Sequence, residues 1–138
     1  MAEVMSAAQA VRHIRDGDIL LVSGFYGQGT APDIVDELVR QGQRNLTVVN
    51  NDGGSTHKGV GRLIYNRQVK KFICSWCGRT PLVPELDEAG EMELELCPQG
   101  SLAERIRAAG FGLGGILTPT GLNTIVETRW GERVTLNG

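Results

Sequence analysis

Amide side chains that could bind a carbonyl or carboxylate group occur at two places in the sequence. Asn50, Asn51 and Asp52 directly follow an apolar run of strand length, and Gln99 lies just after a segment that alternates apolar and acidic residues. Amides donate hydrogen bonds without adding a titrating group, so they suit an oxyanion or a substrate carboxylate. Buried polar groups at a strand end also need partners, and caps of the following loop would satisfy them. The residue types leave both interpretations open.

A glycine-rich segment, residues 23–29, gives a second candidate binding element. Gly24, Gly27 and Gly29 allow backbone N–H groups to face an anionic ligand, and a helix that begins near Pro32 points its positive end at the same loop. The spacing matches neither the dinucleotide pattern nor the Walker pattern, whose lysine is missing. A plain tight turn between a strand and a helix explains the same residues.

Cysteines and a group of acidic residues suggest other chemistry. Cys74 and Cys77 form a CxxC, but Cys74 falls inside an expected strand, and no second pair or neighbouring histidine completes a metal site. We therefore expect buried, inert cysteines and no bound metal. Glu91, Glu93 and Glu95 share one face of an expected strand, and we expect them to be solvated rather than catalytic.

Strands and helices alternate along the chain, and this alternation predicts how the polar loops are placed. Continuous apolar runs are typical of strands that are buried on both faces. The pattern predicts an α/β fold, an open, mostly parallel sheet with helices on both faces, in a single domain over residues 1–138. The loops after the strands then share one ligand-binding edge. The expected strands are residues 19–22, 46–49, 69–76 and 92–96, and the expected helices are residues 6–16, 33–41, 60–65, 82–88 and 101–109.

The last of these helices places Gln99. Ser101 and Glu104 have the spacing of a capping box, so the helix is expected to begin at Ser101. Gly100 permits a turn before it. Gln99 would then lie at the carboxyl end of a strand, beside a helix N-terminus, where open α/β sheets bind their ligands.

The C-terminal part of the chain predicts mainly extended structure. Residues 116–117 indicate a short strand, and residues 124–127 and 133–136 are expected to form a hairpin. Asn137-Gly138 is a strong hairpin-turn dipeptide with no strand after it. We interpret the chain as stopping early, with one apolar strand edge unpaired.

Composition excludes several classes of protein. The chain has 138 residues, a net charge of −2, 41% hydrophobic and 22% charged residues, values that are ordinary for one globular domain. The charge predicts neither a nucleic acid nor an anionic membrane as a partner. We expect no signal peptide and no membrane span. The three cysteines, an odd number, fit a reducing compartment, which predicts a cytoplasmic protein.

Five segments in order resemble the alpha (A) subunit of the family I CoA-transferases, over nearly the whole chain. Residues 93–107, which include Cys-Pro-Gln-Gly-Ser-Leu-Ala-Glu-Arg, and the glycine-rich residues 112–121 match the family closely. They are most similar to the acetate and butyrate–acetoacetate branch. The other three segments are residues 23–32, 49–53 and 69–78.

The resemblance implies transfer of CoA from an acyl-CoA to a short-chain carboxylic or oxo acid, with CoA esters as substrates and no cofactor. The family's mechanism is ping-pong, and its catalytic glutamate becomes a glutamyl-CoA thioester. That glutamate belongs to the beta (B) subunit, and its Glu-Asn-Gly setting has no match here. We therefore expect no catalytic nucleophile in this chain and a hetero-oligomer built from alpha/beta (A/B) pairs.

The resemblance also assigns residues. Asn50, Asn51 and Gln99 correspond to the amides of the family's reaction pocket, and Gly24 and Phe25 to the loop that faces it; together they form the expected substrate and oxyanion site. The residues expected to contact CoA are Gly27, Gly29 and Gly100.

The sequence departs from the family pattern in two loops and in length. Residues 29–32 are one residue longer than the family's Gly-x-Pro, and Ser-Thr-His-Lys at residues 55–58 is unusual for the group. The alpha chains of the family also continue past Gly138. The alternative function is a non-catalytic module of the same fold that binds a CoA ester or a sugar phosphate. A sugar-phosphate isomerase would need an acid/base pair that we do not find.

Overall fold

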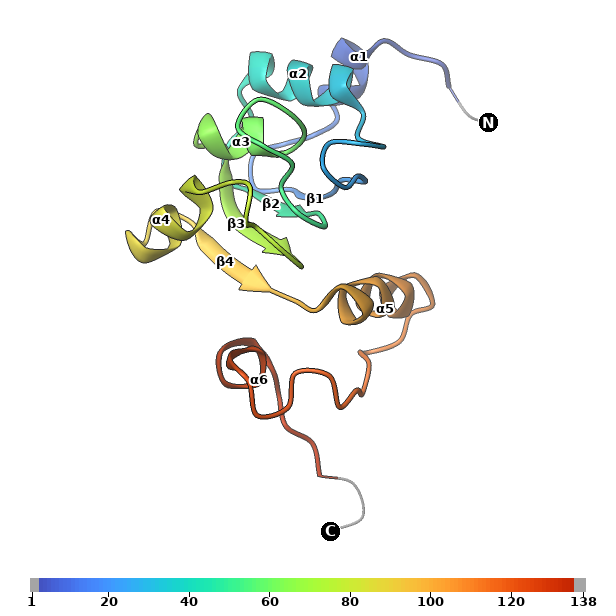
Figure 1. Cartoon of the computed structure of the whole chain (residues 1–138). Coiled ribbons are helices and arrows are strands. Elements are labelled where there is room, and N and C mark those ends of the chain that lie inside the picture. The colour runs from blue at the N-terminus through green and yellow to red at the C-terminus, as the bar shows by residue number, and fades with distance from the viewer. Residues whose placement is uncertain (1–2, 136–138) are drawn as a thin grey trace.

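A computed structural model describes residues 3–135 and contains one four-stranded sheet. All neighbouring strands are parallel, in the order β1-β2-β3-β4, so each crossover moves the chain one position along the sheet (Figure 1). This arrangement confirms the expected open parallel sheet. The strands are β1 (Ile19–Leu21), β2 (Leu46–Val49), β3 (Val69–Cys74) and β4 (Glu93–Leu96).

Helices cover both faces of the sheet. In Figure 1, α1, α2 and α3 lie above the strands, α4 lies beside β4, and α5 lies on the opposite side. Residues of α1 to α4 pack on the sheet in one large core, whereas α5 packs on a smaller second cluster. The helices are α1 (Ala7–Val11), α2 (Pro32–Gln41), α3 (Gly61–Tyr65), α4 (Leu82–Glu88), α5 (Gln99–Gly110) and α6 (Ile125–Trp130).

The larger core forms around the central strands β2 and β3. Val48 and Phe72 are fully buried there, in the same core as Leu38 of α2 and Leu63 of α3. Burying each such side chain stabilises the fold by about 1.5–3 kcal/mol. Removing either central strand would therefore expose the apolar faces of several helices at once. The larger core in this way holds the loops at the carboxyl edge of the sheet.

The first strand differs from the expectation. Ile19 and Leu21 are 66% and 60% exposed, whereas Leu20 and Val22 pack on the larger core. β1 is the edge strand of the described sheet, and the cluster that includes α5 involves β2 and β3 instead. Because no described element covers the second face of β1, the prediction of burial on both faces is wrong for this strand.

The first helix is shorter than expected. Ser6 caps it in a capping box with Gln9, whose side chain accepts a hydrogen bond from the Ser6 backbone at 2.9 Å. The helix ends at Val11 instead of residue 16, and among residues 12–16 only Ile14 packs on the core. Its expected end, Gly17, takes a left-handed backbone conformation in the turn before β1. The helices α2, α3 and α4 follow the expected ranges within one residue.

The helix after β4 begins earlier than expected. α5 starts at Gln99, after Pro98, and no side chain caps it. The predicted capping box is wrong: Ser101 lies inside the helix, and Glu104 pairs with Arg107 at 2.6 Å. Proline before the first turn supplies the extended backbone that ends the strand. Gln99 consequently occupies the first turn of α5 rather than the end of β4.

The C-terminal part of the chain forms a helix where a hairpin was expected. Residues 124–127 belong to the start of α6, where the Thr124 side chain accepts a hydrogen bond from the Val126 backbone at 3.2 Å. Residues 116–117 and 133–135 are not strands in the described structure. An ion pair between Arg129 and Asp87 ties α6 to α4 at 2.7 Å. The Thr124 cap therefore favours a helix, although the β-branched residues favour a strand. Residues 136–138, with the expected Asn-Gly turn, lie outside the described residues.

Candidate functional site

The carboxyl edge of the sheet holds a cavity of about 580 Å³. Segments that follow all four strands contribute to it, as expected for a parallel sheet. The structure brings together two of the expected amides and the expected phenylalanine, and adds three residues that sequence reasoning had not assigned. The lining residues are Phe25, Tyr26, Asn51, Ser75, Trp76 and Gln99.

Two neighbouring loops in this site repeat the same backbone structure. Phe25 and Gln28 exchange backbone hydrogen bonds of 3.0 and 2.9 Å, and Ser55 and Lys58 do the same at 3.0 and 3.2 Å. We call residues 25–28 and 55–58 the first and second hairpin loops. The sequence signal was available but missed, because each hairpin is enclosed by glycines five residues apart (24 and 29, 54 and 59).

Glycine is required at the base of each hairpin. Gly24 has φ +123°, and a Cβ atom there would lie 2.3 Å from the hydroxyl oxygen of Thr30. Gly54 has φ +70°, and a Cβ atom there would lie 2.5 Å from the carbonyl oxygen of Lys58. Both the backbone conformation and the close approach exclude a side chain. The two hairpins also touch, since Gly59 lies against Gly27.

Asp52 joins the two hairpin loops. Its side chain is buried, with one carboxylate oxygen accepting a hydrogen bond from the Tyr26 backbone at 2.8 Å and the other accepting one from Gly54 at 3.0 Å. The first of these bonds holds Tyr26 in a left-handed conformation, φ 54°, which a non-glycine residue seldom adopts. Asp52 therefore places the Tyr26 ring at the cavity.

Asn50 is placed differently from the expected ligand donor. Its side-chain nitrogen donates to the carbonyl oxygen of Val22 at 2.7 Å, and its side-chain oxygen accepts from the backbone of Asp52 at 3.2 Å and Gly53 at 3.0 Å. The residue is buried and does not line the cavity. The loop-capping interpretation left open by the sequence therefore describes Asn50.

Asn51 and Gln99 occupy the positions expected of ligand donors. Both line the cavity, and neither side-chain amide has a hydrogen-bond partner among residues 3–135. The backbone of Asn51 is held firmly, because its carbonyl oxygen accepts bonds from the backbone and hydroxyl of Ser75, both at 2.9 Å. Gln99 is held by the first turn of α5. The backbones of both residues are thus held in place, while their side-chain amides remain free to bind a ligand.

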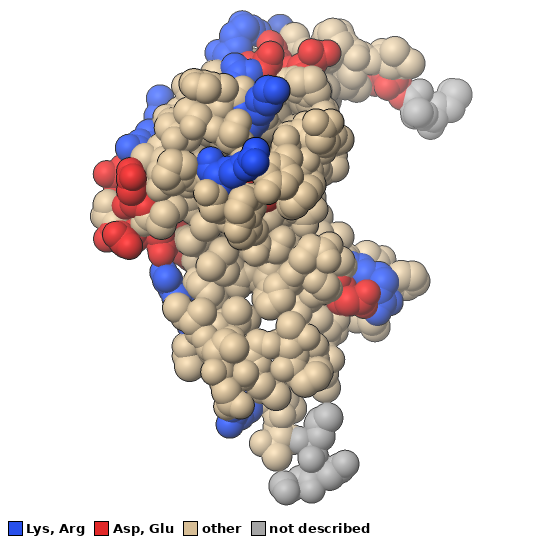
Figure 2. Space-filling view, in the orientation of Figure 1, with Lys and Arg blue, Asp and Glu red and all other residues tan. Residues whose placement is uncertain are grey.

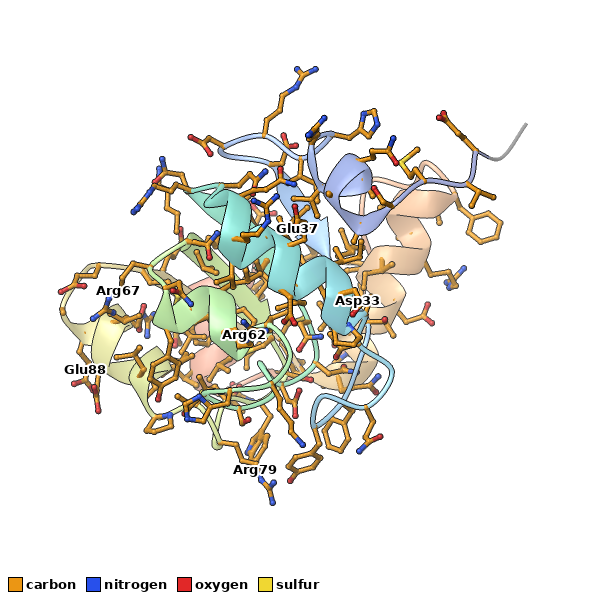
Figure 3. The ribbon with its side chains drawn as sticks, turned by 90° about the horizontal axis from the view of Figure 1, so that it is seen from above. Asp33, Glu37, Arg62, Arg67, Arg79 and Glu88 are labelled. Atoms are coloured by element: carbon orange, nitrogen blue, oxygen red, sulfur yellow. The ribbon has the colours of Figure 1, made fainter. Side chains whose placement is uncertain are left out.

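Aromatic side chains form one wall of the cavity. The rings of Phe25 and Tyr26 lie edge to face with centroids 4.5 Å apart, and the Trp76 ring lies 5.7 Å from that of Tyr26. The guanidinium of Arg79 stacks on Tyr26 at 4.2 Å from the ring centroid. Arg79 lies at the periphery of the molecule and points outward (Figure 3). The wall is apolar toward the cavity and cationic at its outer edge.

The glycines that were expected to contact CoA lie near the cavity but do not line it. Gly27 is at the tip of the first hairpin, where an added Cβ would lie 3.4 Å from the Lys58 side chain. The carbonyl oxygen of Gly29 accepts a hydrogen bond from the Ser23 hydroxyl at 2.7 Å. Gly100 lies in the first turn of α5 with open space around it. Their contacts with a ligand stay a prediction.

Glu95 departs from the expected solvated position. It is buried and pairs with Arg105 at 2.6 Å and with Lys71 at 3.0 Å. Desolvation opposes its charge, but the hydrogen bonds from Arg105 and Lys71 outweigh it and lower the pKa of Glu95. Glu91 and Glu93 are exposed, as expected. Glu95 therefore has a structural ion pair and is not available as an acid or base.

Charge is unevenly distributed over the surface. In Figure 2, many charged side chains lie over the upper part of the molecule, where α1 to α4 lie, and a smaller group lies on the right at the position of α5. Over residues 3–135, no cluster of three or more histidine, cysteine or acidic side chains could hold a metal ion. No helix in that range is both long and apolar enough to cross a membrane.

The arrangement can bind a reactant but does not supply a nucleophile. Ser75 is the one hydroxyl-bearing aliphatic residue in the lining, and its hydroxyl already donates to Asn51. The lining includes no carboxylate, histidine or cysteine. Free amides facing an aromatic wall can orient a carbonyl or carboxylate group and stabilise negative charge on it. The fold and the cavity thus define a protein that can bind a ligand with a carbonyl or carboxylate group at the carboxyl edge of its sheet.

Comparison with known proteins agrees with this class. The model of the coenzyme A transferase family matches residues 4–138, and the chain belongs to that family. It is 44% identical over 124 residues to the acetoacetyl-CoA:acetate/butyrate CoA transferase alpha subunit of Clostridium acetobutylicum, covering 90% of this chain and 56% of that protein. It is 42% identical over 136 residues to the alpha subunit of the acetate CoA-transferase of Escherichia coli K12, covering 99% and 61%.

The fold agrees with solved structures of the family. An acyl-CoA transferase from Escherichia coli O157:H7, solved as a thioester complex with CoA, superposes with a TM-score of 0.77 and 29% identity. The match covers 91% of this chain and 26% of that one. The resemblance to alpha subunits found in the sequence is therefore confirmed. The chain spans less than two thirds of the length of the alpha subunits described above.

Proposed function

We propose that this chain is the substrate-binding part of the alpha subunit in a heteromeric acyl-CoA:carboxylate CoA-transferase. The observation that carries the proposal is the pair of free amides, Asn51 and Gln99, in a cavity without a nucleophile. For the transfer reaction, such a cavity needs a reacting group from outside its lining. The similarity to proteins named as alpha subunits supports a partner, the beta subunit.

The proposed reaction has two half-reactions. A glutamate on the beta subunit attacks the acyl-CoA thioester carbonyl, and CoA thiolate leaves as an acyl–glutamyl anhydride forms. The thiolate then attacks the glutamyl carbonyl of the anhydride, which releases the first acid and leaves a glutamyl-CoA thioester. The second acid reverses these steps. CoA esters are substrates throughout, and no resident cofactor is required.

Asn51 and Gln99 act on the charged oxygens of these steps. Each carbonyl addition places negative charge on an oxygen, and a fixed amide N–H that points to that oxygen stabilises it more than it stabilises the ground state. Phe25, Tyr26 and Trp76 exclude water from one side of the reacting group. Asn50 holds the loops that carry these residues. The proposed acids are short carboxylic or oxo acids, by similarity to the alpha subunits named for acetate and butyrate.

Reconstitution tests this function. The chain is produced alone and together with the beta subunit, and transfer of CoA from acetoacetyl-CoA to acetate is followed by the loss of the acetoacetyl-CoA enolate absorbance. We expect activity only in the mixture, and a borohydride-sensitive glutamyl-CoA thioester on the beta chain. Activity of this chain alone would overturn the half-site. Binding of a CoA ester without any catalytic partner would favour the alternative of a non-catalytic module.

A further inference from the structure

The CxxC segment brings both of its cysteine side chains to the larger core, with Cys74 inside it and Cys77 packed against it. Cys74 ends β3, and the chain then bends sharply, because the backbone N–H groups of Ser75 and Trp76 both donate to the same acceptor, the Asn51 carbonyl oxygen, at 2.9 and 3.1 Å. Gly78 permits the bend to close, since a Cβ atom there would lie 2.5 Å from the Trp76 indole.

The two thiols have unequal environments. Cys74 is completely buried, whereas Cys77 is partly exposed at the surface, one residue after Trp76. The neighbouring Cys74 thiol lowers the pKa of Cys77 to about 7, although desolvation opposes the shift. The neighbouring Cys77 thiol, burial and the charge of Asp52 raise the pKa of Cys74. Cys77 is thus the accessible nucleophile and Cys74 the protonated partner, the asymmetry of dithiol redox sites.

The third cysteine does not belong to this pair. Cys97 packs in the smaller cluster with Val49 and Leu102, whereas Cys74 lies in the larger core. The Cys97 backbone donates a hydrogen bond to the Cys74 carbonyl oxygen at 2.8 Å, so the two residues lie on neighbouring parallel strands. Their side chains belong to different clusters, and a disulfide between them would have to pass through the sheet. Cys97 therefore serves as a matched control.

We propose that Cys77 and Cys74 form a redox-active pair that is oxidised by low-molecular-weight disulfides such as glutathione disulfide. The Cys77 thiolate attacks one sulfur of the disulfide, forms a mixed disulfide and releases one thiolate. Cys74 then loses its proton to solvent, and its sulfur attacks the Cys77 sulfur and releases the second thiolate. The two protein thiols are oxidised by two electrons, and one disulfide is reduced to two thiols.

Oxidation would change the cavity, because the two residues enclosed by the pair, Ser75 and Trp76, both line it. A covalent link shortens the distance between the sulfurs, so the bend that carries Trp76 must adjust. The proposal does not depend on the transferase activity. Thiol oxidation is measured directly on this chain, so a failure of the redox proposal can be distinguished from a failure of the proposed function.

The test uses the full 138-residue chain in glutathione buffers of increasing oxidised fraction. After acid quenching, free thiols are labelled with maleimide, and peptide mapping identifies the linked cysteines. We expect wild type and Cys97→Ser to lose two labelled thiols together through a Cys74–Cys77 disulfide. Cys74→Ala should stop at a glutathione adduct on Cys77. Cys77→Ser should react with glutathione disulfide at least about tenfold more slowly than wild type.

Three outcomes would overturn the pair. They are a disulfide that includes Cys97, equal reactivity of Cys77→Ser and wild type, and the absence of any Cys74–Cys77 link at the most oxidising ratio. Circular dichroism confirms that each variant is folded, and Cys74→Ala provides the adduct readout if Cys77→Ser is unstable. The change of Trp76 fluorescence on oxidation, measured in Trp130→Phe, reports the effect on the cavity.

Discussion

At the end of β2, adjacent asparagines have separate environments. The Asn50 amide is enclosed by the backbone of the two loops, and the Asn51 amide is at the cavity. Both residues directly follow β2, which ends at Val49. The contrast therefore comes from the partners of each side chain, which are backbone groups for Asn50 and none among residues 3–135 for Asn51.

Removing either free amide should reduce turnover without unfolding the chain. In the reconstituted enzyme, Asn51→Ala and Gln99→Ala should each lower kcat by about 10²–10³-fold, the usual cost of one oxyanion donor. Their free energies of unfolding should stay within about 0.5 kcal/mol of wild type, because neither amide has a protein partner. Steady-state kinetics and urea unfolding measure the two effects. Gln28→Ala, a glutamine outside the cavity lining, is the control, and full activity of Gln99→Ala would exclude its role.

Asn50→Ala should lower the free energy of unfolding, which Asn51→Ala and Gln99→Ala should leave almost unchanged. The variant leaves the Val22 carbonyl and the Gly53 N–H without their partners in a buried site, which costs about 1–3 kcal/mol for each unsatisfied group. We expect a clear loss of unfolding free energy in urea. Asn66→Ala is the control, because the side-chain nitrogen of that exposed asparagine donates only to Arg62. An Asn50→Ala protein as stable as wild type would contradict the scaffold role.

Among the structural elements, the two hairpin loops depend on backbone conformation more than on side chains. Each hairpin closes with only two backbone hydrogen bonds, so its shape relies on glycines at its base and on Asp52. The loops carry the ligand face because the rigid sheet beneath them holds their ends.

Alanine substitutions at Gly24 and Gly100 should change the stability of the chain in opposite directions. Gly24→Ala should destabilise the chain by more than about 1 kcal/mol, because its φ is positive and Thr30 occupies the space of the new methyl group. Gly100→Ala should stabilise it by about 0.5–1 kcal/mol, because alanine favours the helix and nothing obstructs it. Thermal unfolding measures both. A raised KM for acyl-CoA in the stabilised Gly100→Ala variant would support contact of Gly100 with CoA; an unchanged KM would remove that assignment.

The ion pair between β3, β4 and α5 should make stability depend on pH. The pKa of Glu95 is lowered in the folded state, so its contribution is present above the ordinary glutamate pKa and is lost as the pH falls through the folded value. Glu95→Gln should be less stable at neutral pH and should show a flatter decline as the pH falls below the ordinary glutamate pKa. Urea unfolding across this range is the measurement. Glu104→Gln, which removes an exposed pair with Arg107, should change little.

For the molecule as a whole, the apolar outer face of β1 is the unusual feature. Proteins often carry charged or polar residues on an edge strand, which keeps it from pairing with other chains, but the exposed side chains of Ile19 and Leu21 in β1 are apolar. The isolated chain therefore exposes surface that favours association.

Polar residues on that face should lessen association of the isolated chain. Ile19→Thr with Leu21→Thr should reduce binding of a hydrophobic dye and lower the apparent mass in light scattering, since both side chains are mostly solvent-exposed. The unfolding midpoint should change little, because threonine favours strands. Leu20→Thr is the control and should destabilise the chain, since Leu20 packs on the core. Unchanged dye binding in the double variant would show that another surface is responsible.

Local patterns predicted most of the elements but not their surroundings. An apolar run located β2, alternating apolar and acidic residues located β4, and glycine and proline located α2 and the loops. The hairpin expected over residues 124–136 failed because the Thr124 cap and the following polar residues favour a helix. The early start of α5 was missed because Pro98 ends the strand and begins the helix in one step.

By itself, the sequence determined the alternation of strands and helices, the parallel sheet and the family, because these depend on local periodicity and on motif order. Only the tertiary structure decided which polar side chains remain free. Asn50 and Glu95 lost their availability to partners distant in the chain, while Asn51 and Gln99 did not. Hydrogen bonds between segments far apart in sequence have no local pattern, so residue types alone could not separate a donor from a scaffold.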